Sequence, residues 1–321
     1  LDIPNSRRVG ALRNCGHMVL TPGALHVAVQ DELWSVNPET GAIQGKIKSP
    51  QPVPGETFDW GYLDISGDAL IGSGQKPGAS LSKLDRTTVT DLIEGDFRPV
   101  IMSNYLFCLD SASGQPRWTY QSGCVVNNAI AVADGKLLFV ESRNPEAVND
   151  ADGRIRADVF CAQDTFLVAL DLVSGAKVYE QSVKLPFQHI LFLNCGGGLA
   201  LITGTSNAGD KVKYDLYAHD IASGAEKWHA DYLPGEGIDG THGEQWQHPL
   251  IIGDKVVTNP PSRDAFPHGT IGWQWHHQYC SGDHHDWRKR FSDLPRQHPE
   301  HLEQHHYERR NGAPRRQHAT Q

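Results

Sequence analysis

Short apolar runs alternate with polar turns along most of this chain, from about residue 15 to about residue 260. Four of these runs, at 32–36, 105–109, 166–170 and 215–219, lead directly into an Asp or Asn. Runs of this length between turn residues are typical of β-strands, because helices usually need roughly ten or more residues with a 3.6-residue period. The pattern therefore predicts an all-β fold of short strands.

The turns after these runs share one spacing: an Asp or Asn, a Gly four residues later, and a third position four residues beyond that. The four copies are Asn37, Gly41 and Gly45; Asp110, Gly114 and Trp118; Asp171, Gly175 and Tyr179; and Asp220, Gly224 and Trp228. A fixed internal spacing indicates a repeat architecture. The Asp side chain can accept from the turn backbone, and Gly supplies a positive φ. Each copy is predicted to be a hairpin.

A second hairpin signal precedes the second, third and fourth copies, at 63–72, 129–140 and 190–202, and begins once more at 249–257. The clearest is Asp134-Gly135 between two apolar runs, a strong signal for a two-residue turn. Two hairpins make a four-stranded antiparallel blade, and blades in series make a β-propeller. We expect four full blades, part of a fifth, and an irregular C-terminal tail.

The Asp-x-x-Ser-Gly-x-x-x-Trp signature resembles the tryptophan-docking motif of pyrroloquinoline-quinone (PQQ)-type β-propellers, and the resemblance covers roughly residues 15–260. The first copy departs from it at Asn37 and Gly45. The chain is also similar to secreted quinoprotein-like propellers of bacteria. The resemblance implies an extracytoplasmic location and more blades than this chain supplies. The chain begins at Leu1 without a signal sequence, and we expect a fragment whose full-length form carries the remaining blades or a fused domain.

The repeated motif residues invite two interpretations. Asp110, Asp171 and Asp220 could be catalytic carboxylates, and Trp118 and Trp228 could be stacking platforms for a cofactor. Because they recur once per blade, we predict that they are structural: the Asp residues in turns and the aromatic residues between blades. The predicted docking set is Asp110, Gly114, Trp118, Asp171, Gly175, Tyr179, Asp220, Gly224 and Trp228.

Two functions remain open at this point. We predict a non-catalytic binding or interaction scaffold, with a protein or small-molecule ligand on a propeller face. The alternative is a fragment of a PQQ-dependent quinoprotein dehydrogenase acting on alcohols or sugars. For catalytic members, the resemblance implies a vicinal Cys pair, a calcium site of Glu, Asn and Asp, and an Asp base. The chain has no Cys-Cys pair, so PQQ and calcium are implied by resemblance alone.

The amino-acid composition argues against some classes of binding partner. Residues 1–262 hold 20 basic and 31 acidic residues, for a net charge of −11, which argues against nucleic acid. No apolar run is long enough to span a membrane. The six cysteines form no Cys-x-x-Cys pair, and their disulfide pairing is open.

The composition changes near Ser262, which divides the chain into a propeller at 1–261 and a tail at 262–321. The tail is rich in His, Arg and Gln, and nine of the 17 His lie between His276 and His318. It could be a disordered polar extension, a metal-binding segment through His276-His277 and His284-His285, or the product of a shifted reading frame. We favour irregular or non-native sequence.

Two insertions, at 73–103 and 142–164, interrupt blades two and three. The second contains 149–153, which resembles a calcium loop. An EF-hand alignment fails because it places Val148 and Val159 where carboxylates are needed. A looser calcium loop and a solvated polar turn remain as interpretations.

The best candidate metal site lies at 241–248. On a strand, His242, Glu244 and His248 share one face with Trp246. Two imidazoles and a carboxylate suit zinc or another first-row divalent ion. The alternative is that these side chains hydrogen-bond across a blade and Trp246 packs.

Overall fold

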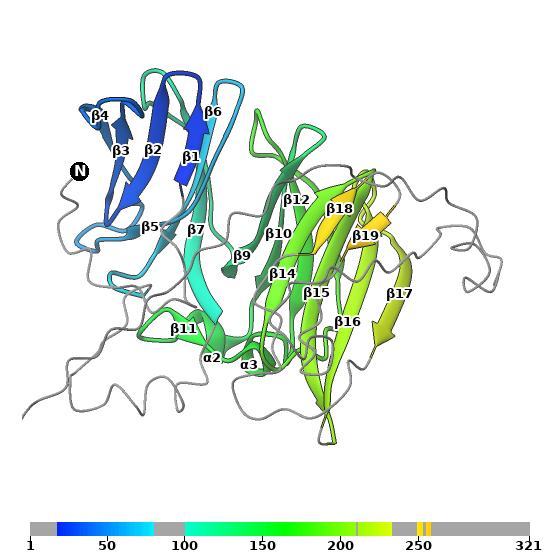
Figure 1. The fold of residues 1–321 in the computed structure, drawn as a ribbon. Coiled ribbons are helices and arrows are strands. Elements are labelled where there is room, and N and C mark those ends of the chain that lie inside the picture. The colour runs from blue at the N-terminus through cyan, green and yellow to red at the C-terminus, as the bar shows by residue number, and fades with distance from the viewer. Residues whose placement is uncertain (1–17, 80–99, 210, 233–248, 253–254, 258–321) are drawn as a thin grey trace, which may run out of the picture. The chain divides into compact units, whose positions relative to one another are not determined.

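The computed structural model describes residues 18–79, 100–209, 211–232, 249–252 and 255–257. The regular secondary structure of this part of the chain is almost all β-strand, as predicted (Figure 1). None of its helices has the length and apolar character that a membrane span requires.

Blade 1 is a four-stranded sheet whose strands pair in chain order. It comprises β1 (Met18–Thr21), β2 (Ala24–Val29), β3 (Glu32–Val36) and β4 (Ile43–Lys48). All three pairings are antiparallel. This order is a simple meander, in which each strand returns beside the one before it.

The next eight blade strands form two further meanders. Blade 2 comprises β5 (Asp59–Ser66), β6 (Ala69–Gln75), β7 (Val100–Asp110) and β8 (Pro116–Tyr120). Blade 3 comprises β9 (Cys124–Ala133), β10 (Lys136–Ser142), β12 (Thr165–Asp171) and β13 (Lys177–Ser182). The start of β7 also pairs with β9, through Met102 with Val126 and Ser103 with Val125, so the two blades share one nine-stranded sheet.

Blade 4 comprises β14 (Leu191–Gly196), β15 (Leu199–Ala208), β16 (Lys211–Asp220) and β17 (Glu226–Tyr232). A fifth sheet begins with β18 (Leu250–Ile252) and β19 (Lys255–Val257). Four complete antiparallel blades and the opening hairpin of a fifth confirm the predicted fold class, an all-β propeller. The predicted tail at 262–321 lies outside the described residues.

The predicted Asp-Gly hairpin of blade 3 has the expected geometry. Asp134 and Gly135 have φ values of 49° and 70°, and the flanking Ala133 and Lys136 pair directly. Two successive positive φ values define the type I′ turn, whose twist matches that of the strands it joins. Local chemistry therefore fixes the register of β9 against β10.

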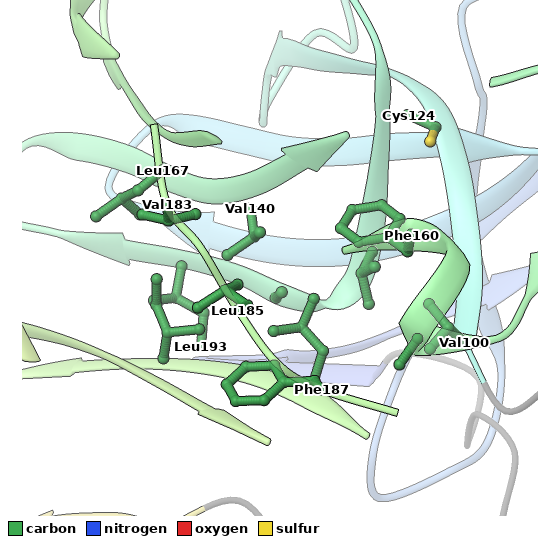
Figure 2. Close-up of a cluster of buried hydrophobic side chains, with 14 of the residues drawn as sticks. Val100, Cys124, Val140, Phe160, Leu167, Val183, Leu185, Phe187 and Leu193 are labelled. Atoms are coloured by element: carbon green, nitrogen blue, oxygen red, sulfur yellow. The ribbon is translucent and has the colours of Figure 1, made fainter. Parts of the chain in front are cut away.

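The hydrophobic core lies in layers between consecutive blades. Leu33 of blade 1 packs with Leu70 and Phe107 of blade 2. The largest layer brings Leu167 of blade 3 together with Leu193 of blade 4 and with Leu185 and Phe187 of the connection between them (Figure 2). The central strands of blades 2 and 3 bury most side chains on both faces, which explains why apolar residues dominate them.

The insertion of blade 3 is present, with slightly narrower bounds than predicted. Between β10 and β12 the chain forms α2 (Pro145–Val148), β11 (Arg154–Ile155) and α3 (Ala157–Phe160). The insertion of blade 2 begins after Gln75, and its residues 80–99 lie outside the described part of the chain. We call residues 76–79 and 143–164 together the insertion end.

Candidate functional site

Each repeated Asp accepts hydrogen bonds within its own turn. In blade 2, Asp110 Oδ1 accepts from the backbone N–H of Ser113 at 2.9 Å and from its hydroxyl at 2.8 Å. The other oxygen, Oδ2, accepts from Arg117 Nη2 at 2.6 Å. These hydrogen bonds, led by the one from Arg117, lower the pKa of Asp110. The side chain is thus held ionised as a turn cap, with both oxygens bonded.

The other three copies repeat the turn hydrogen bonds at Oδ1. Asp171 accepts from the Ser174 backbone at 2.8 Å, and Asp220 accepts from the Ser223 backbone at 3.0 Å. The Lys227 ammonium and the Ser223 groups lower the pKa of Asp220 to about 2. In blade 1, Asn37 Oδ1 accepts from the backbone of Glu39 and Thr40. A neutral amide therefore fills the same place, because the turn needs only an acceptor.

The aromatic positions contact the turn glycine of the following blade. A Cβ built on Gly175 would lie 2.6 Å from Trp118 Cγ, and one on Gly224 would lie 2.6 Å from Tyr179 Cε2. Trp118 Nε1 also donates to the Leu172 carbonyl at 3.0 Å. Only glycine can accept a ring at that distance, and its φ of about 70° suits the turn.

Two details differ from the prediction. First, the contact from blade 1 is made by Ile47, whose Cγ2 would lie 3.3 Å from a Cβ on Gly114, whereas a Cβ built on Gly45 would meet nothing within 4 Å. Residues two apart on a strand share a face, so Ile47 occupies the space that Gly45 leaves. Second, Trp118, Tyr179 and Trp228 are partly exposed, because they lie on the outermost strand of each blade.

Trp228 packs on the core of blade 4 beside Leu216 and Ala218, in a cluster that also includes Ile251 of the fifth sheet. Its Nε1 is buried and has no hydrogen-bond partner among the described residues. The equivalent nitrogen of Trp118 bonds the next blade, so the two docking positions differ in their polar contact.

The insertion end ties blade 3 to blade 2. The pair Arg154 and Ile155 forms β11, which pairs with Ile101 and Val100 at the start of β7. Lys76 Nζ donates to the Asp150 carbonyl, and Arg154 Nε donates to the Ala79 carbonyl. The blade 3 insertion therefore supplies an extra strand to blade 2 and is fixed on it by two cationic side chains.

The segment 149–153 is a polar turn in this structure. Asp150 Oδ1 accepts from the backbone N–H groups of Asp152 and Arg154, each at 3.0 Å. A Cβ on Gly153 would lie 3.2 Å from the Lys76 side chain. The Asp150 carboxylate thus organises its own loop, as the polar-turn interpretation proposed.

A buried polar cluster lies where blades 2 and 3 share a sheet. Ser73 and Ser103 hydroxyls are 2.7 Å apart, and Ser103 donates to Asn127 Oδ1 at 2.6 Å. Asn127 Nδ2 donates to Gln75 Oε1 at 2.8 Å. All four side chains are buried. Because each polar group finds a partner from the other blade or a neighbouring strand, the cluster specifies how the blades meet.

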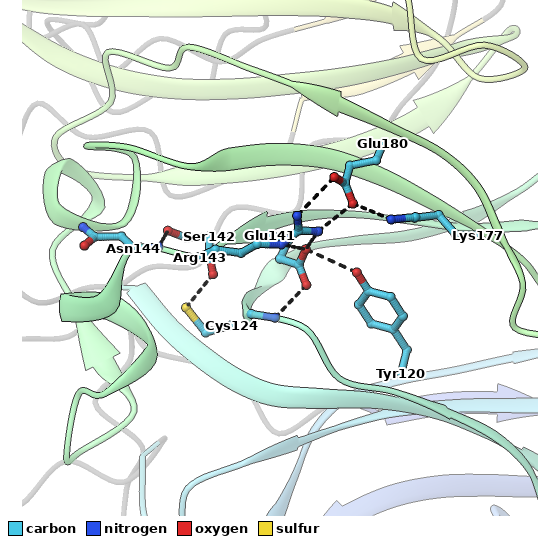
Figure 3. A network of polar contacts seen from close by, with 9 residues as sticks. Tyr120, Cys124, Glu141, Ser142, Arg143, Asn144, Lys177 and Glu180 are labelled. Atoms are coloured by element: carbon cyan, nitrogen blue, oxygen red, sulfur yellow. Dashed lines mark hydrogen bonds and ion pairs between the residues drawn. The ribbon is translucent and has the colours of Figure 1, made fainter.

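A second network surrounds Glu141, which is fully buried (Figure 3). Its oxygens accept from the Gly123 backbone at 2.9 Å, from Tyr120 at 3.2 Å and from Arg143 Nη2 at 2.6 Å. Arg143 also binds Glu180 at 2.6 Å and lowers the pKa of Glu180 to about 2. Burial raises the pKa of Tyr120 to about 12. This network fixes the connection between blades 2 and 3.

Sequence reasoning missed both polar groups. Glu141 and Ser142 end an apolar run, and two polar residues at the end of a buried strand were the available signal. For the Asn127 cluster the sequence signal was weaker: Asn127 and Asn128 interrupt the otherwise apolar strand β9. Neither signal predicts which residues bond to these polar groups, because the bonding residues lie on strands distant in the sequence.

One further carboxylate of blade 4 is fully buried. Lys213 Nζ and His229 Nε2 each lie 2.9 Å from Asp215 Oδ1. The His229 ring stacks on Tyr217 with centroids 4.1 Å apart. The hydrogen bond from Lys213 to Asp215 raises the pKa of the Lys213 ammonium. The cation neutralises Asp215, so the group forms a structural ion pair at the outer strands.

The predicted metal residues His242, Glu244 and His248 lie outside the described residues, as do the paired His of the tail. Within the described ranges, no three His, Cys, Asp or Glu side chains are grouped so that they could hold a metal ion. The four described cysteines, Cys108, Cys124, Cys161 and Cys195, are free thiols.

Comparison with known proteins gave structural similarities alone. No protein-family model matches the chain, and no curated protein matches it. Among solved structures, BamB from Moraxella catarrhalis is similar at 13% identity and a TM-score of 0.40, covering 76% of this chain and 57% of that one. The quinohemoprotein alcohol dehydrogenase ADHIIG from Pseudomonas putida HK5 is similar at 11% identity and a TM-score of 0.41.

The overlap with the dehydrogenase covers 76% of this chain and 39% of that chain. The computationally designed Ika8 protein is similar at 9% identity and a TM-score of 0.39, with 76% and 69% covered. This chain thus spans little more than half of the BamB structure and a smaller part of the dehydrogenase. The fold assignment rests on the strand order and register described above.

Proposed function

We propose that this chain is a non-catalytic, PQQ-like β-propeller that serves as a binding scaffold and holds a protein or small-molecule ligand at the insertion end. The observation that carries the proposal is the extra strand β11, with which the blade 3 insertion extends blade 2. A four-stranded blade does not need this segment to close. Loops held in one conformation on a rigid scaffold are where binding surfaces are usually built.

The state of the motif carboxylates supports the same proposal. Asp110, Asp171 and Asp220 each accept turn hydrogen bonds at Oδ1, and Asp110 and Asp220 also bind Arg117 and Lys227 through Oδ2. A general base needs an accessible lone pair and a pKa near the working pH. Carboxylates with lowered pKa values and bonded oxygens suit a structural role.

The experiment compares the two functions left open by the sequence. The chain is mixed with PQQ and calcium, and reduction of a dye acceptor is followed with a panel of alcohols and sugars. A scaffold gives no PQQ-dependent reduction above the protein-free rate. Turnover that requires PQQ would overturn the proposal in favour of a quinoprotein dehydrogenase.

The insertion end has its own test. The exposed residues Glu146, Asn149 and Arg156 are replaced together by Ala, which leaves the buried Ile155 and Phe160 in place, and the variant is compared with the intact chain in co-purification from the producing cells. We expect a partner that is recovered with the intact chain and lost with the variant, while the β-sheet circular dichroism persists. Equal recovery would place binding elsewhere. Cell fractionation tests the proposed extracytoplasmic location.

The metal proposal for His242, Glu244 and His248 is tested separately by calorimetry with zinc. Binding should weaken as the pH falls through about 6.5, because protons compete for neutral imidazoles. The His242→Ala/His248→Ala double variant should lose this binding. Equal, weak binding by both proteins would assign the metal to the His-rich tail.

A further inference from the structure

Buried polar atoms without a partner are concentrated in blade 4. Among the described residues, seven buried side-chain nitrogen or oxygen atoms have no hydrogen-bond partner, and five of these belong to blade 4: those of Thr203, Thr205, Asp215, His219 and Trp228. A sixth is the hydroxyl of Tyr179, whose ring lies against Gly224 of blade 4. Such an atom has lost water without gaining a protein partner, so each one lowers the free energy of unfolding. Blade 4 therefore bears most of this cost.

The surface of blade 4 that faces blade 3 also differs in composition from its equivalents. Cross-strand register aligns Cys195, Ala200 and His219 in one row, which ends directly before the Asp turn. The same rows of blades 2 and 3 are entirely aliphatic: Ile65, Leu70 and Leu109 in one, and Val132, Leu137 and Leu170 in the other. All three rows lie at the layer shared with the preceding blade. Blade 4 therefore offers blade 3 less apolar surface and adds an imidazole that needs hydrogen bonds.

The docking contact from blade 3 to blade 4 leaves two polar groups unbonded. His219 is 3% exposed, and its Nδ1 lies 3.0 Å from the carbonyl oxygen of Gly224. In the neutral imidazole Nδ1 must carry the proton, because a carbonyl oxygen only accepts, so Nε2 presents a lone pair without a partner. The Tyr179 hydroxyl is also unbonded, whereas Trp118 at the equivalent position of blade 2 donates to the Leu172 carbonyl.

We call the contact between blades 3 and 4 the seam. At the junction of blades 2 and 3 the strands β7 and β9 pair, whereas blade 4 forms a four-stranded sheet of its own and no described strand pairs across the seam. Between the described residues of the two blades, one hydrogen bond crosses the seam, from Gln181 Nε2 to the Ser223 carbonyl at 3.4 Å, at an exposed position. The seam is therefore closed mainly by the apolar layer that contains Phe187.

We propose that blade 4 opens at the seam as a unit while blades 2 and 3 remain folded together. Asp215 lies on the same face of β16 as His219, because strand residues an even number apart share a face. Opening lets water bond Asp215 Oδ2, His219 Nε2 and the Tyr179 hydroxyl, which returns the solvation that these atoms lack in the closed state. Segments that open at low free energy are those that move in binding and regulation, so the seam is a conformational device of this fold. The inference does not depend on a partner at the insertion end.

Native-state hydrogen exchange in low concentrations of urea measures this opening. The central strands β15 and β16 of blade 4 are compared with the central strands β10 and β12 of blade 3 in the same sample, so that fraying of edge strands does not enter the comparison. We expect the amides of β15 and β16 to exchange as one group and roughly a hundredfold faster than those of β10 and β12, because they open without the rest of the fold.

A matched pair of variants tests the cause. Tyr179→Phe removes the unbonded hydroxyl and keeps the ring on Gly224, so exchange in β15 and β16 should slow by roughly threefold to tenfold. Tyr120→Phe makes the same deletion at the junction of blades 2 and 3, where the hydroxyl donates to Glu141, and exchange in blade 3 should become faster. His219→Leu supplies the residue type of Leu109 and Leu170, and it should slow exchange in blade 4 as Tyr179→Phe does.

Two results would overturn the proposal. Exchange in β15 and β16 that is equal to or slower than exchange in β10 and β12 would show that blade 4 does not open by itself. Exchange in blade 4 that is unchanged or faster in both Tyr179→Phe and His219→Leu would show that the unbonded polar atoms do not weaken the seam. Neither readout involves PQQ or a co-purified partner, so failure here is distinct from failure of the proposed scaffold function.

Discussion

Blades 2 and 3 are joined differently from blades 3 and 4. The first junction contains a β7–β9 pairing, the added strand β11 and the Asn127 hydrogen bonds. The second depends on an apolar layer around Phe187, and the hydroxyl of its docking residue Tyr179 has no described partner. Hydrogen bonds form only at one relative placement of the two blades, whereas an apolar layer is stabilised by any placement that excludes water. Both junctions bury an apolar layer, and the first adds the hydrogen bonds that define its geometry.

The largest effect on stability should come from the junction between blades 3 and 4. Phe187 is 1% exposed and lies directly over Gly204, where a Cβ would be 2.3 Å from its ring. Phe187→Ala should lower the free energy of unfolding by about 3–5 kcal/mol, through lost burial and the cavity left behind. Urea unfolding measures this change, with the exposed Val173→Ala as control. A loss no larger than the control's would contradict the assignment of burial to this junction.

The second largest effect should come from the hydrogen-bonded junction between blades 2 and 3. Asn127→Ala removes the acceptor of Ser103 and the donor to Gln75, so buried groups lose partners. We expect a loss of about 2 kcal/mol in the free energy of unfolding. Asn128→Ala, on the other side of the same strand, is the control and should cost less. If hydrogen exchange shows β7 and β9 equally protected in both variants, the cluster does not specify the junction.

The two docking residues give a matched pair. Trp118→Phe deletes the N–H that bonds Leu172, while Tyr179→Phe deletes a hydroxyl that has no described partner. We expect Trp118→Phe to cost about 1 kcal/mol more than Tyr179→Phe, since a net hydrogen bond contributes about that much. Equal values from thermal unfolding would show that the indole bond adds nothing to the contact.

The smallest effect is a pH dependence at the connection between blades 2 and 3. The folded pKa of Glu180 is depressed to about 2 by Arg143, so its stabilisation is complete above the ordinary Glu pKa of about 4.3 and is lost as the pH falls from there through about 2. Glu180→Gln should flatten the decrease of the urea midpoint in that window. The exposed Glu39→Gln should leave the slope unchanged; an unchanged slope in both would remove Glu180 from the acid response.

The repeat, its hairpins and the number of blades were predictable because they depend on local chemistry. Asp134-Gly135 and the Asp110 turn follow from backbone preferences within a few residues. Ile47 was missed because the motif spacing pointed to Gly45, and only the packed sheets show which side chain reaches Gly114. The pairing of β11 with β7 was also missed, since contacts between distant segments depend on burial and leave no periodic signal in a two-residue strand.

The strand β11 has a consequence for biosynthesis. It joins the edge of β7 only after β8, β9 and β10 have been made, so blade 2 cannot acquire its last strand while the ribosome is still producing the start of blade 3. Chains grow from the N-terminus, and domains generally fold as units in that order. Blades 2 and 3 should accordingly mature as one cooperative unit. A polypeptide that terminates before Arg154 leaves Val100 and Ile101 without their strand partner, and this open edge can pair with another chain.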